Sequence, residues 1–294
     1  MLLQGIIPPL VTPMNADESL DLPGLRKHID FLLGKNVDGI FVLGTTGEFY
    51  ALDEAEKQAV VAEAVAHCKG RSPVYVGTGA ETTREVLRLT KMAEREGAQG
   101  VSVITPYFIK PNQAELIEHF TRIAESTPLP VVLYNNPATC GGVSIEPDTV
   151  AKLAEVPNII GIKDSSGDLQ NTIELIKRTP RDRFAVLNGR DTLIAAAMMF
   201  GASGAIPATG NVAPEFCVGI YQAAIAGNWD EAKRLQDRLA PVRLALTLAT
   251  GNGAIKEAMA LLGRPAGPNR LPISALNTEK KQKLREVLTK SGLM

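Results

Sequence analysis

The sequence predicts an α/β protein, a closed (β/α)₈ TIM barrel followed by a C-terminal helical extension. Three observations lead to this fold class. Eight short apolar runs alternate with segments of helical periodicity, which is the pattern of βαβ units with parallel strands. The runs recur at intervals of about 25–35 residues, a spacing typical of such units. The 294 residues, 45% of them hydrophobic, suit one barrel, because barrels of this class commonly have about 250 residues.

The expected strands are short apolar runs separated by helical segments. The helices carry local signals: an acidic first turn at residues 53–56, a capping-box pattern at 82–85 and a terminal glycine at Gly97. Eight strands favour a closed barrel, but an open doubly wound sheet remains the alternative, because strand number alone does not prove closure. The expected strands are residues 6–12, 39–43, 74–77, 100–104, 131–135, 159–163, 184–188 and 204–207.

The chain divides at the point where the strands stop. Residues 1–227 are expected to form the barrel, and residues 228–294 to form an extension of three helices packed on it. No linker composition and no low-complexity segment separates the two parts, so one structural unit is predicted. The three helices are expected over residues 228–248, 254–262 and 278–290.

Composition excludes several classes of partner. With 31 basic and 32 acidic residues the formal charge is -1, and no basic run is present, so nucleic acid is not an expected partner. The N-terminus lacks the charged region of a signal peptide, and the longest weakly polar stretch, residues 193–206, is too short to span a bilayer. Three scattered cysteines form no disulfide framework. A cytoplasmic protein without a membrane partner is expected.

Metal and hydrolase chemistry are also disfavoured. The three histidines, His28, His67 and His119, all fall inside predicted helices and show no metal-ligand spacing. They are expected to be packing or surface residues. No G-x-S-x-G motif is present, which disfavours a serine hydrolase.

Lys163 is the residue that most directly suggests chemistry. It follows the apolar run 159–162 and precedes the polar turn 164–168, so it stands at the C-terminal end of a core strand. Partial desolvation there disfavours the ammonium form, and a neutral amine attacks carbonyl groups to form Schiff bases. The alternative is a lysine that caps the strand with its head in solvent.

The residues that follow the other strands form the expected rim of the barrel, where barrel enzymes hold their active sites. Hydroxyl groups dominate this rim, with one lysine and no pair of carboxylates. The loop 44–48, Gly-Thr-Thr-Gly-Glu, suits an anion bound by N–H and hydroxyl groups, although an ordinary tight turn is the alternative. Tyr134 lies at the end of a strand and Tyr107 follows one, and both are able to move protons. The alternative for each is a core aromatic.

Three motifs together resemble the dihydrodipicolinate synthase / N-acetylneuraminate lyase family. They are the loop 44–48, the segment Tyr134-Asn135-x-Pro137 and the segment Gly161-Ile162-Lys163, in the order and spacing of that family. The resemblance runs from Gly5 to the C-terminus. It implies a class I, pyruvate-type aldolase or lyase on a (β/α)₈ barrel, without metal or organic cofactor. It also implies a homotetramer built as a dimer of dimers.

The resemblance further implies roles for individual residues. Lys163 would form a covalent imine with the keto carbon of pyruvate or another 2-keto acid, and Tyr134 would move protons. Thr45 and Thr46 would hold the carboxylate. Two residues would line the site near the imine through backbone atoms, Gly189 and Ile206.

Two departures bear on the second substrate, an aldehyde. Synthases of the family carry an arginine two residues after the proline of the Tyr-Asn-x-Pro motif, where it binds the carboxylate of aspartate semialdehyde; here that position is Thr139. They also have adjacent tyrosines where this chain has Tyr107-Phe108. Losing a bidentate carboxylate clamp is not conservative. The expected reaction is therefore cleavage, or the reverse condensation, of a 2-keto-3-deoxy sugar acid to pyruvate and an aldehyde.

The alternatives are a 4-hydroxy-tetrahydrodipicolinate (dihydrodipicolinate) synthase or a Schiff-base dehydratase or hydratase of the same family. A non-enzymatic paralogue is disfavoured because Lys163, Tyr134 and Thr45 are all present.

The segment 188–191 adds two candidate substrate contacts. It resembles the segment where sialic acid lyases hold the hydroxylated chain, and Asp191 matches that pattern. Thr192 and Ala208 stand where an acidic residue and a serine are expected, which argues against sialic acid itself. Arg190 is a candidate contact for a second carboxylate, with a solvated loop charge as the alternative. The segments 5–9 and 211–214 resemble aldolases for 2-keto-3-deoxy sugar acids.

Overall fold

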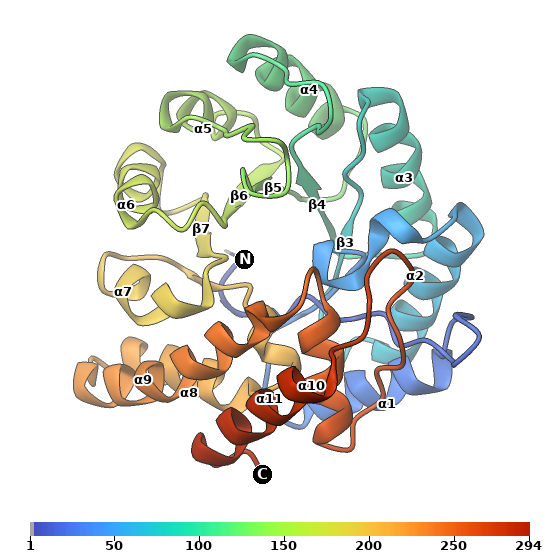
Figure 1. The fold of residues 1–294 in the computed structure, drawn as a ribbon. Helices are drawn as coiled ribbons and strands as arrows, with labels where there is room; N and C mark the ends of the chain where they lie inside the picture. The colour runs from blue at the N-terminus through green and yellow to red at the C-terminus, as the bar shows by residue number, and fades with distance from the viewer. Residues whose placement is uncertain (1–2) are drawn as a thin grey trace.

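The computed structural model describes residues 3–294, in which eight parallel strands are surrounded by helices (Figure 1). Residues 1–2, the start of the predicted barrel domain, lie outside the described part. The strands follow the order β1-β8-β7-β6-β5-β4-β3-β2, so from β2 to β8 each strand pairs with its neighbour in sequence, and β1 pairs with β8. The strands are β1 (Gly5–Ile6), β2 (Ile40–Val42), β3 (Val74–Gly77), β4 (Gly100–Ile104), β5 (Val131–Asn135), β6 (Ile159–Asp164), β7 (Ala185–Asn188) and β8 (Gly204–Ala205).

The first strand closes the barrel, although it is shorter than the predicted residues 6–12. Pro8 and Pro9 have no N–H to donate, so the regular ladder ends after Ile6. The following segment still bonds to β2: Phe41 N donates to Pro8 O at 3.3 Å, and Leu10 N donates to Phe41 O at 2.8 Å. These bonds join the two ends of the strand order, and the predicted barrel is confirmed over the open sheet.

Helices connect successive strands and form the outer ring in Figure 1. Several begin at the predicted signals: Asp53 and Glu56 form a capping box, and Thr82 accepts a hydrogen bond from Glu85 N. None of the helices in the described part of the chain has the length and hydropathy that crossing a membrane requires. The helices of the ring are α1 (Leu22–Leu33), α2 (Glu54–Cys68), α3 (Thr83–Arg95), α4 (Gln113–Glu125), α5 (Pro147–Leu153), α6 (Leu169–Arg178), α7 (Ile194–Met199) and α8 (Pro214–Ile225).

The C-terminal helices lie close to their predicted positions and pack on one side of the barrel, beside α8 and α1 in Figure 1. They share an apolar core with the barrel: Val11 and Val212 pack in one cluster with Val242, Met259 and Leu284. Burying this common apolar surface holds the extension against the barrel. The three helices are α9 (Trp229–Ala245), α10 (Gly253–Leu261) and α11 (Thr278–Lys290).

His28 of α1 belongs to the polar network where the barrel closes. The side-chain amide nitrogen of Asn211 donates to Pro9 O and Ala208 O. The other end of this amide, Oδ1, accepts hydrogen bonds from Val11 N at 3.1 Å and from His28 Nε2 at 2.9 Å. His28 is fully buried, and this burial lowers the pKa of its imidazole to about 4. The predicted packing role of His28 is confirmed.

Acid is therefore expected to destabilise the fold through His28. Its folded pKa lies below the unfolded value of 6.5, so the unfolded state binds more protons between these values and stability falls as pH drops from 6.5 toward 4. Between pH 7.5 and pH 5 the loss from this residue is about 2 kcal/mol. Urea unfolding of the wild type and of His28→Gln at both pH values measures it. Equal pH dependence in the two proteins would contradict the assignment.

Candidate active site

Lys163 and Tyr134 lie side by side inside the mouth of the barrel. The register of the sheet pairs Tyr134 of β5 with Lys163 of β6, and paired residues on parallel strands point to the same face. Lys163 is only 5% exposed. Its Nζ lies 4.3 Å from the centroid of the Tyr134 ring and 5.5 Å from that of Phe41. The amine is thus enclosed by aromatic rings, and a strand cap with its head in solvent does not describe it.

No carboxylate within residues 3–294 lies within 4.0 Å of the Lys163 amine. The adjacent Asp164 is buried but bonds elsewhere: its side chain accepts from Asn135 Nδ2 at 3.0 Å, Thr172 Oγ1 at 2.7 Å and Ser166 N at 3.1 Å. Strand alternation places Asp164 on the opposite face of β6. Lys163 therefore has aromatic neighbours and no counter-ion in contact, so its amine stays available to a ligand.

Gly189 gives Lys163 its space. Gly189 N donates to Asp164 O at 2.7 Å, and this bond brings the loop after β7 against β6. A Cβ at position 189 would lie 2.0 Å from Ser165 Oγ and 3.1 Å from Lys163 Cε, so a larger residue would displace the Ser165 side chain and crowd the lysine. Ile206, the other predicted lining residue, is buried with Phe41 in the apolar cluster that fills the barrel.

The loop 44–48 turns a hydroxyl toward the site. The carbonyl oxygens of Thr45, Thr46 and Gly47 all accept hydrogen bonds, from the Asn252 side chain at 3.1 and 2.7 Å and from Thr12 Oγ1 at 2.7 Å. In contrast, Thr45 Oγ1 is buried without a partner among the described residues. A buried hydroxyl without a partner is unfavourable unless a ligand bonds it. The loop therefore suits an anionic group bound beside Thr45.

A cavity of about 530 Å³ opens beside this loop. Thr45 borders it and also borders a smaller cavity shared with Phe41 and Tyr134, so Thr45 lies between the two spaces. The lining is apolar or hydroxylated and contains no charged side chain. The lining residues are Thr45, Phe49, Tyr50, Ile104, Tyr107, Thr139, Cys140, Thr250, Gly251, Pro272 and Ile273.

The two tyrosines occupy different parts of the site. Tyr134 is 6% exposed, and its hydroxyl accepts a hydrogen bond from Asn136 Nδ2 at 3.0 Å. Tyr107 lines the larger cavity and packs edge-on against Phe49, with ring centroids 6.3 Å apart. Burial, reinforced by the negative charge of Glu81, raises the pKa of Tyr107. Tyr107 therefore stays protonated at neutral pH, and Tyr134 is the phenol beside the amine.

Arg190 and Asp191 contact protein groups and do not line the cavity. Asp191 is 2% exposed; its Oδ2 accepts from Thr209 N at 2.7 Å and lies 3.8 Å from Arg243 Nε. Arg190 is exposed and its guanidinium lies against Gly167. Asp191 thereby holds the loop after β8 in place. Contact of these two residues with substrate remains a prediction.

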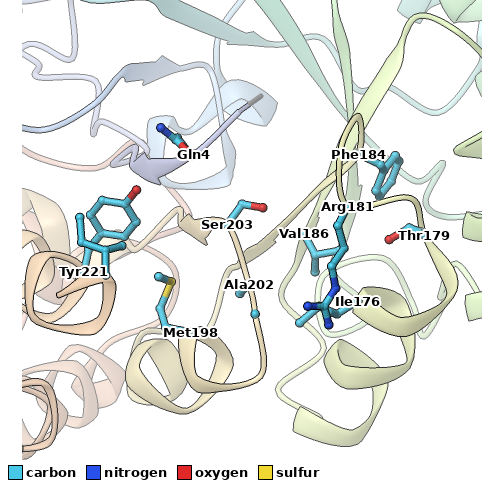
Figure 2. A pocket seen from close by; sticks show the side chains of 12 residues that line it. Gln4, Ile176, Thr179, Arg181, Phe184, Val186, Met198, Ala202, Ser203 and Tyr221 are labelled. Atoms are coloured by element: carbon cyan, nitrogen blue, oxygen red, sulfur yellow. The ribbon is translucent and has the colours of Figure 1, made fainter. Parts of the chain in front are cut away.

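A second cavity lies at the opposite end of the barrel. It measures about 250 Å³ and is bordered by Gln4 and Ser203, which precede β1 and β8, together with Arg181 and Tyr221 (Figure 2). None of the predicted site residues lines it. Among residues 3–294, no three His, Cys, Asp or Glu side chains group in a way that would hold a metal ion. The absence of a cofactor remains a prediction.

Sequence reasoning missed two sets of site residues. The first is Phe41, whose ring lies near the Lys163 amine. The sequence predicts a strand there, but an all-apolar run does not show which of its side chains point into the barrel. The second set comes from the extension: Asn252 holds the loop 44–48, and Thr250 and Ile273 line the cavity. The only sequence signal was the polar, glycine-flanked segment 250–253 between two predicted helices.

Comparison with known proteins decides the family. The family model described as "Dihydrodipicolinate synthetase family" matches residues 2–291. The chain belongs to this family. Its members are class I, pyruvate-dependent aldolases and lyases that form a lysine Schiff base, and the protein is accordingly an enzyme of this class.

Relatives in this family match the chain over nearly its whole length. A 4-hydroxy-tetrahydrodipicolinate synthase of Methanoculleus marisnigri is 41% identical, covering 99% of this chain and 100% of its own. The Neisseria meningitidis protein of that name is 39% identical, with 99% of each chain covered. Among solved structures, a prophage protein of the family from E. coli K12, in complex with pyruvate, has a TM-score of 0.96 at 37% identity and covers 100% of both chains.

Proposed function

We propose that the protein makes or breaks carbon–carbon bonds through an imine between Lys163 and the keto carbon of pyruvate. The observation that supports this most directly is the buried amine, 4.3 Å from the centroid of the Tyr134 ring. It lies at the C-terminal end of a barrel strand, where barrel enzymes hold their chemistry. Thr45 contributes a buried hydroxyl without a partner among the described residues, which suits the carboxylate of the keto acid.

The proposed reaction follows from imine chemistry. The amine adds to the keto carbon, and loss of water leaves a protonated imine that withdraws electrons from the neighbouring methyl carbon. That carbon loses a proton to form an enamine, whose electron pair attacks the aldehyde carbon; the aldehyde oxygen takes up a proton. Water then releases the product and restores the lysine. Cleavage is the same sequence in reverse.

Two further groups support these steps. Tyr134 is proposed to carry protons to and from the imine nitrogen and the aldehyde oxygen. Thr45 and Thr46 begin a 3₁₀ turn, whose first N–H groups have no partner within the turn, and together with the Thr45 hydroxyl they are proposed to hold the pyruvate carboxylate. Fixing the carboxylate fixes the distance between the keto carbon and the amine.

For the second substrate, the comparisons favour the synthase alternative of the sequence analysis over its first choice. The curated relatives reported above are named 4-hydroxy-tetrahydrodipicolinate synthase. We infer that condensation of pyruvate with aspartate semialdehyde is the first reaction to assay. Cleavage of a 2-keto-3-deoxy sugar acid is not specifically supported by these names. One structural observation keeps it as the second candidate: the cavity beside Thr45 has Thr139 in its wall and no charged side chain.

A competition between aldehydes tests the proposal. Pyruvate consumption would be measured with aspartate semialdehyde and with glyceraldehyde, and pyruvate release with a 2-keto-3-deoxy sugar acid. Preference for aspartate semialdehyde supports the synthase reaction; preference for the hydroxylated substrates supports the lyase. A dehydratase is recognised by a product that has lost water but keeps all its carbons. If pyruvate is neither consumed nor released in any reaction, the proposed carbon–carbon chemistry is wrong.

Thr139→Arg is expected to change the aldehyde preference. A guanidinium in the cavity wall would pair with the carboxylate of aspartate semialdehyde, raising kcat/KM for it about tenfold. Turnover of uncharged hydroxyaldehydes should fall, because the side chain fills space and adds no complementary group. Thr139→Gln is the matched control, since it fills similar space without charge. Equal effects of the two substitutions on aspartate semialdehyde would contradict the role of charge.

We also propose assembly into a homotetramer in the cytoplasm. The loop after β4 presents Phe108 and Ile109 to solvent, 89% and 75% exposed, and apolar side chains so exposed suit contact with a second copy. A family structure 33% identical, with a TM-score of 0.96, is described as a monomeric variant, so analytical ultracentrifugation must determine the oligomeric state. Three free, buried cysteines suit a reducing compartment.

A further inference from the structure

We propose that Asn252 and Lys256 of the C-terminal extension are positioning residues for the loop 44–48, and that they set the affinity for pyruvate. This inference rests on the proposed role of Thr45 in holding the carboxylate. Both residues lie outside the barrel sequence, about 200 positions from the loop, and neither borders the two cavities that Thr45 borders. Their effect on pyruvate must therefore pass through the loop.

Asn252 holds the loop by its backbone. Its Nδ2 donates to Thr46 O at 2.7 Å and to Thr45 O at 3.1 Å across 206 and 207 residues of sequence. Asn252 immediately precedes α10 but makes no side-chain cap bond to that helix. The side chain therefore serves the loop and not the helix. By turning two carbonyl oxygens away from the site, it leaves the Thr45 hydroxyl facing a ligand.

Lys256 holds the other end of the loop. It lies one helical turn after Asn252, so both residues are on the same face of α10. Lys256 Nζ lies 2.6 Å from Glu48 Oε1 and donates to Pro268 O at 2.7 Å. Glu48 Oε2 also accepts from Arg270 N at 3.3 Å. The carboxylate of the last residue of the Gly-Thr-Thr-Gly-Glu motif is thus held by groups of the extension.

Because this ion pair is buried, its role is to fix the conformation of the loop 44–48 and not to add to the stability of the fold. The Lys256 and Glu48 side chains are 2% and 1% exposed, and the desolvation of such a pair offsets much of its Coulombic gain. Glu48 also has a left-handed backbone, with φ 56°, a conformation that a non-glycine residue adopts only when its surroundings hold it. An apolar pair would offer no charged group to bond this turn, which presents Thr45.

The test compares Lys256→Met and Asn252→Leu with Lys281→Met. Lys281 of α11 pairs with Glu257 Oε2 of α10 at 2.9 Å, so its replacement removes an ion pair of the same extension without touching the loop. Lys256→Met and Asn252→Leu are each expected to raise KM for pyruvate about tenfold, with kcat lowered less than about threefold. Lys281→Met should leave KM within about twofold of the wild type. Circular dichroism checks that each variant folds.

The outcomes separate this inference from the proposed function. If Lys256→Met does not fold, Asn252→Leu carries the test, and Lys256→Met with Glu48→Gln removes the unpaired buried charge and restores folding. Unchanged KM in folded Asn252→Leu, or an equal rise in Lys281→Met, overturns the positioning role. In that case a wild type that still forms the pyruvate imine keeps the proposed function. A wild type that forms no imine refutes the proposed function instead.

Discussion

Lys163→Met is expected to lower kcat/KM for pyruvate-dependent turnover by about a thousandfold or more. Methionine has a similar length and fills the space between Phe41 and Tyr134, but it offers no amine to the keto carbon. The thermal midpoint should not fall, because Lys163 is only 5% exposed and within residues 3–294 no carboxylate pairs with its amine. Steady-state pyruvate consumption and differential scanning calorimetry measure the two effects.

Lys177→Met provides the control for this prediction. Lys177 lies on the surface of α6 with a side chain 64% exposed, so the same substitution there should leave activity unchanged. If Lys163→Met keeps more than about a tenth of the wild-type activity, covalent catalysis by this residue is wrong, since loss of a nucleophile is not tolerated at that level.

Tyr134→Phe is expected to lower kcat about a hundredfold or more, the usual range for loss of a proton-transfer group. The ring remains, so the contact with the Lys163 amine and the packing of the barrel mouth are kept. Stopped-flow kinetics should show slower imine formation as well as slower turnover. The hydroxyl that is removed accepts a hydrogen bond from Asn136, and the loss of this one bond affects stability by about 1 kcal/mol.

Tyr221→Phe is the matched control, because Tyr221 borders the cavity at the opposite end of the barrel (Figure 2). It should retain full activity. If kcat of Tyr134→Phe falls by no more than about twofold and does not differ from kcat of Tyr221→Phe, proton transfer by Tyr134 is contradicted.

The approach of Lys163 to Tyr134 follows from the sequence because a general rule of topology applies. Parallel strands in one barrel end at the same rim, so residues far apart in the chain that end strands are brought together. The register of β5 and β6 then pairs the two directly. Strand ends were harder to place: the predicted first strand, residues 6–12, ignored the missing N–H groups of Pro8 and Pro9.

The rule that parallel strands end at one rim does not predict the contacts made by the C-terminal extension. Asn252 and Lys256 meet the loop 44–48 only because α10 packs on the side of the barrel where that loop lies. That docking depends on the apolar cluster of Val11, Val242 and Met259, and the periodicity of a helix gives its apolar face without naming the surface it covers. The sequence therefore predicts the reacting groups better than it predicts the groups that position them.

The choice of aldehyde shows a different limit. At Thr139, local chemistry and overall similarity lead to different expectations. The local chemistry favours a hydroxylated aldehyde, and the overall similarity favours aspartate semialdehyde. The local view stresses a missing guanidinium, while the relatives named as synthases match over nearly the full chain. Neither view alone measures how a carboxylated aldehyde fits a cavity lined by hydroxyl and apolar groups. Thr139→Arg and its glutamine control address that question.

Trapping the imine tests the central claim most directly. The wild-type protein would be incubated with pyruvate, reduced with sodium borohydride, digested and mapped by mass spectrometry. Lys163→Met and a sample without pyruvate are the controls. The proposed mechanism predicts one reduced pyruvyl adduct, on the peptide that contains Lys163, and none in either control. An adduct on another lysine, or no adduct under conditions of turnover, would contradict it.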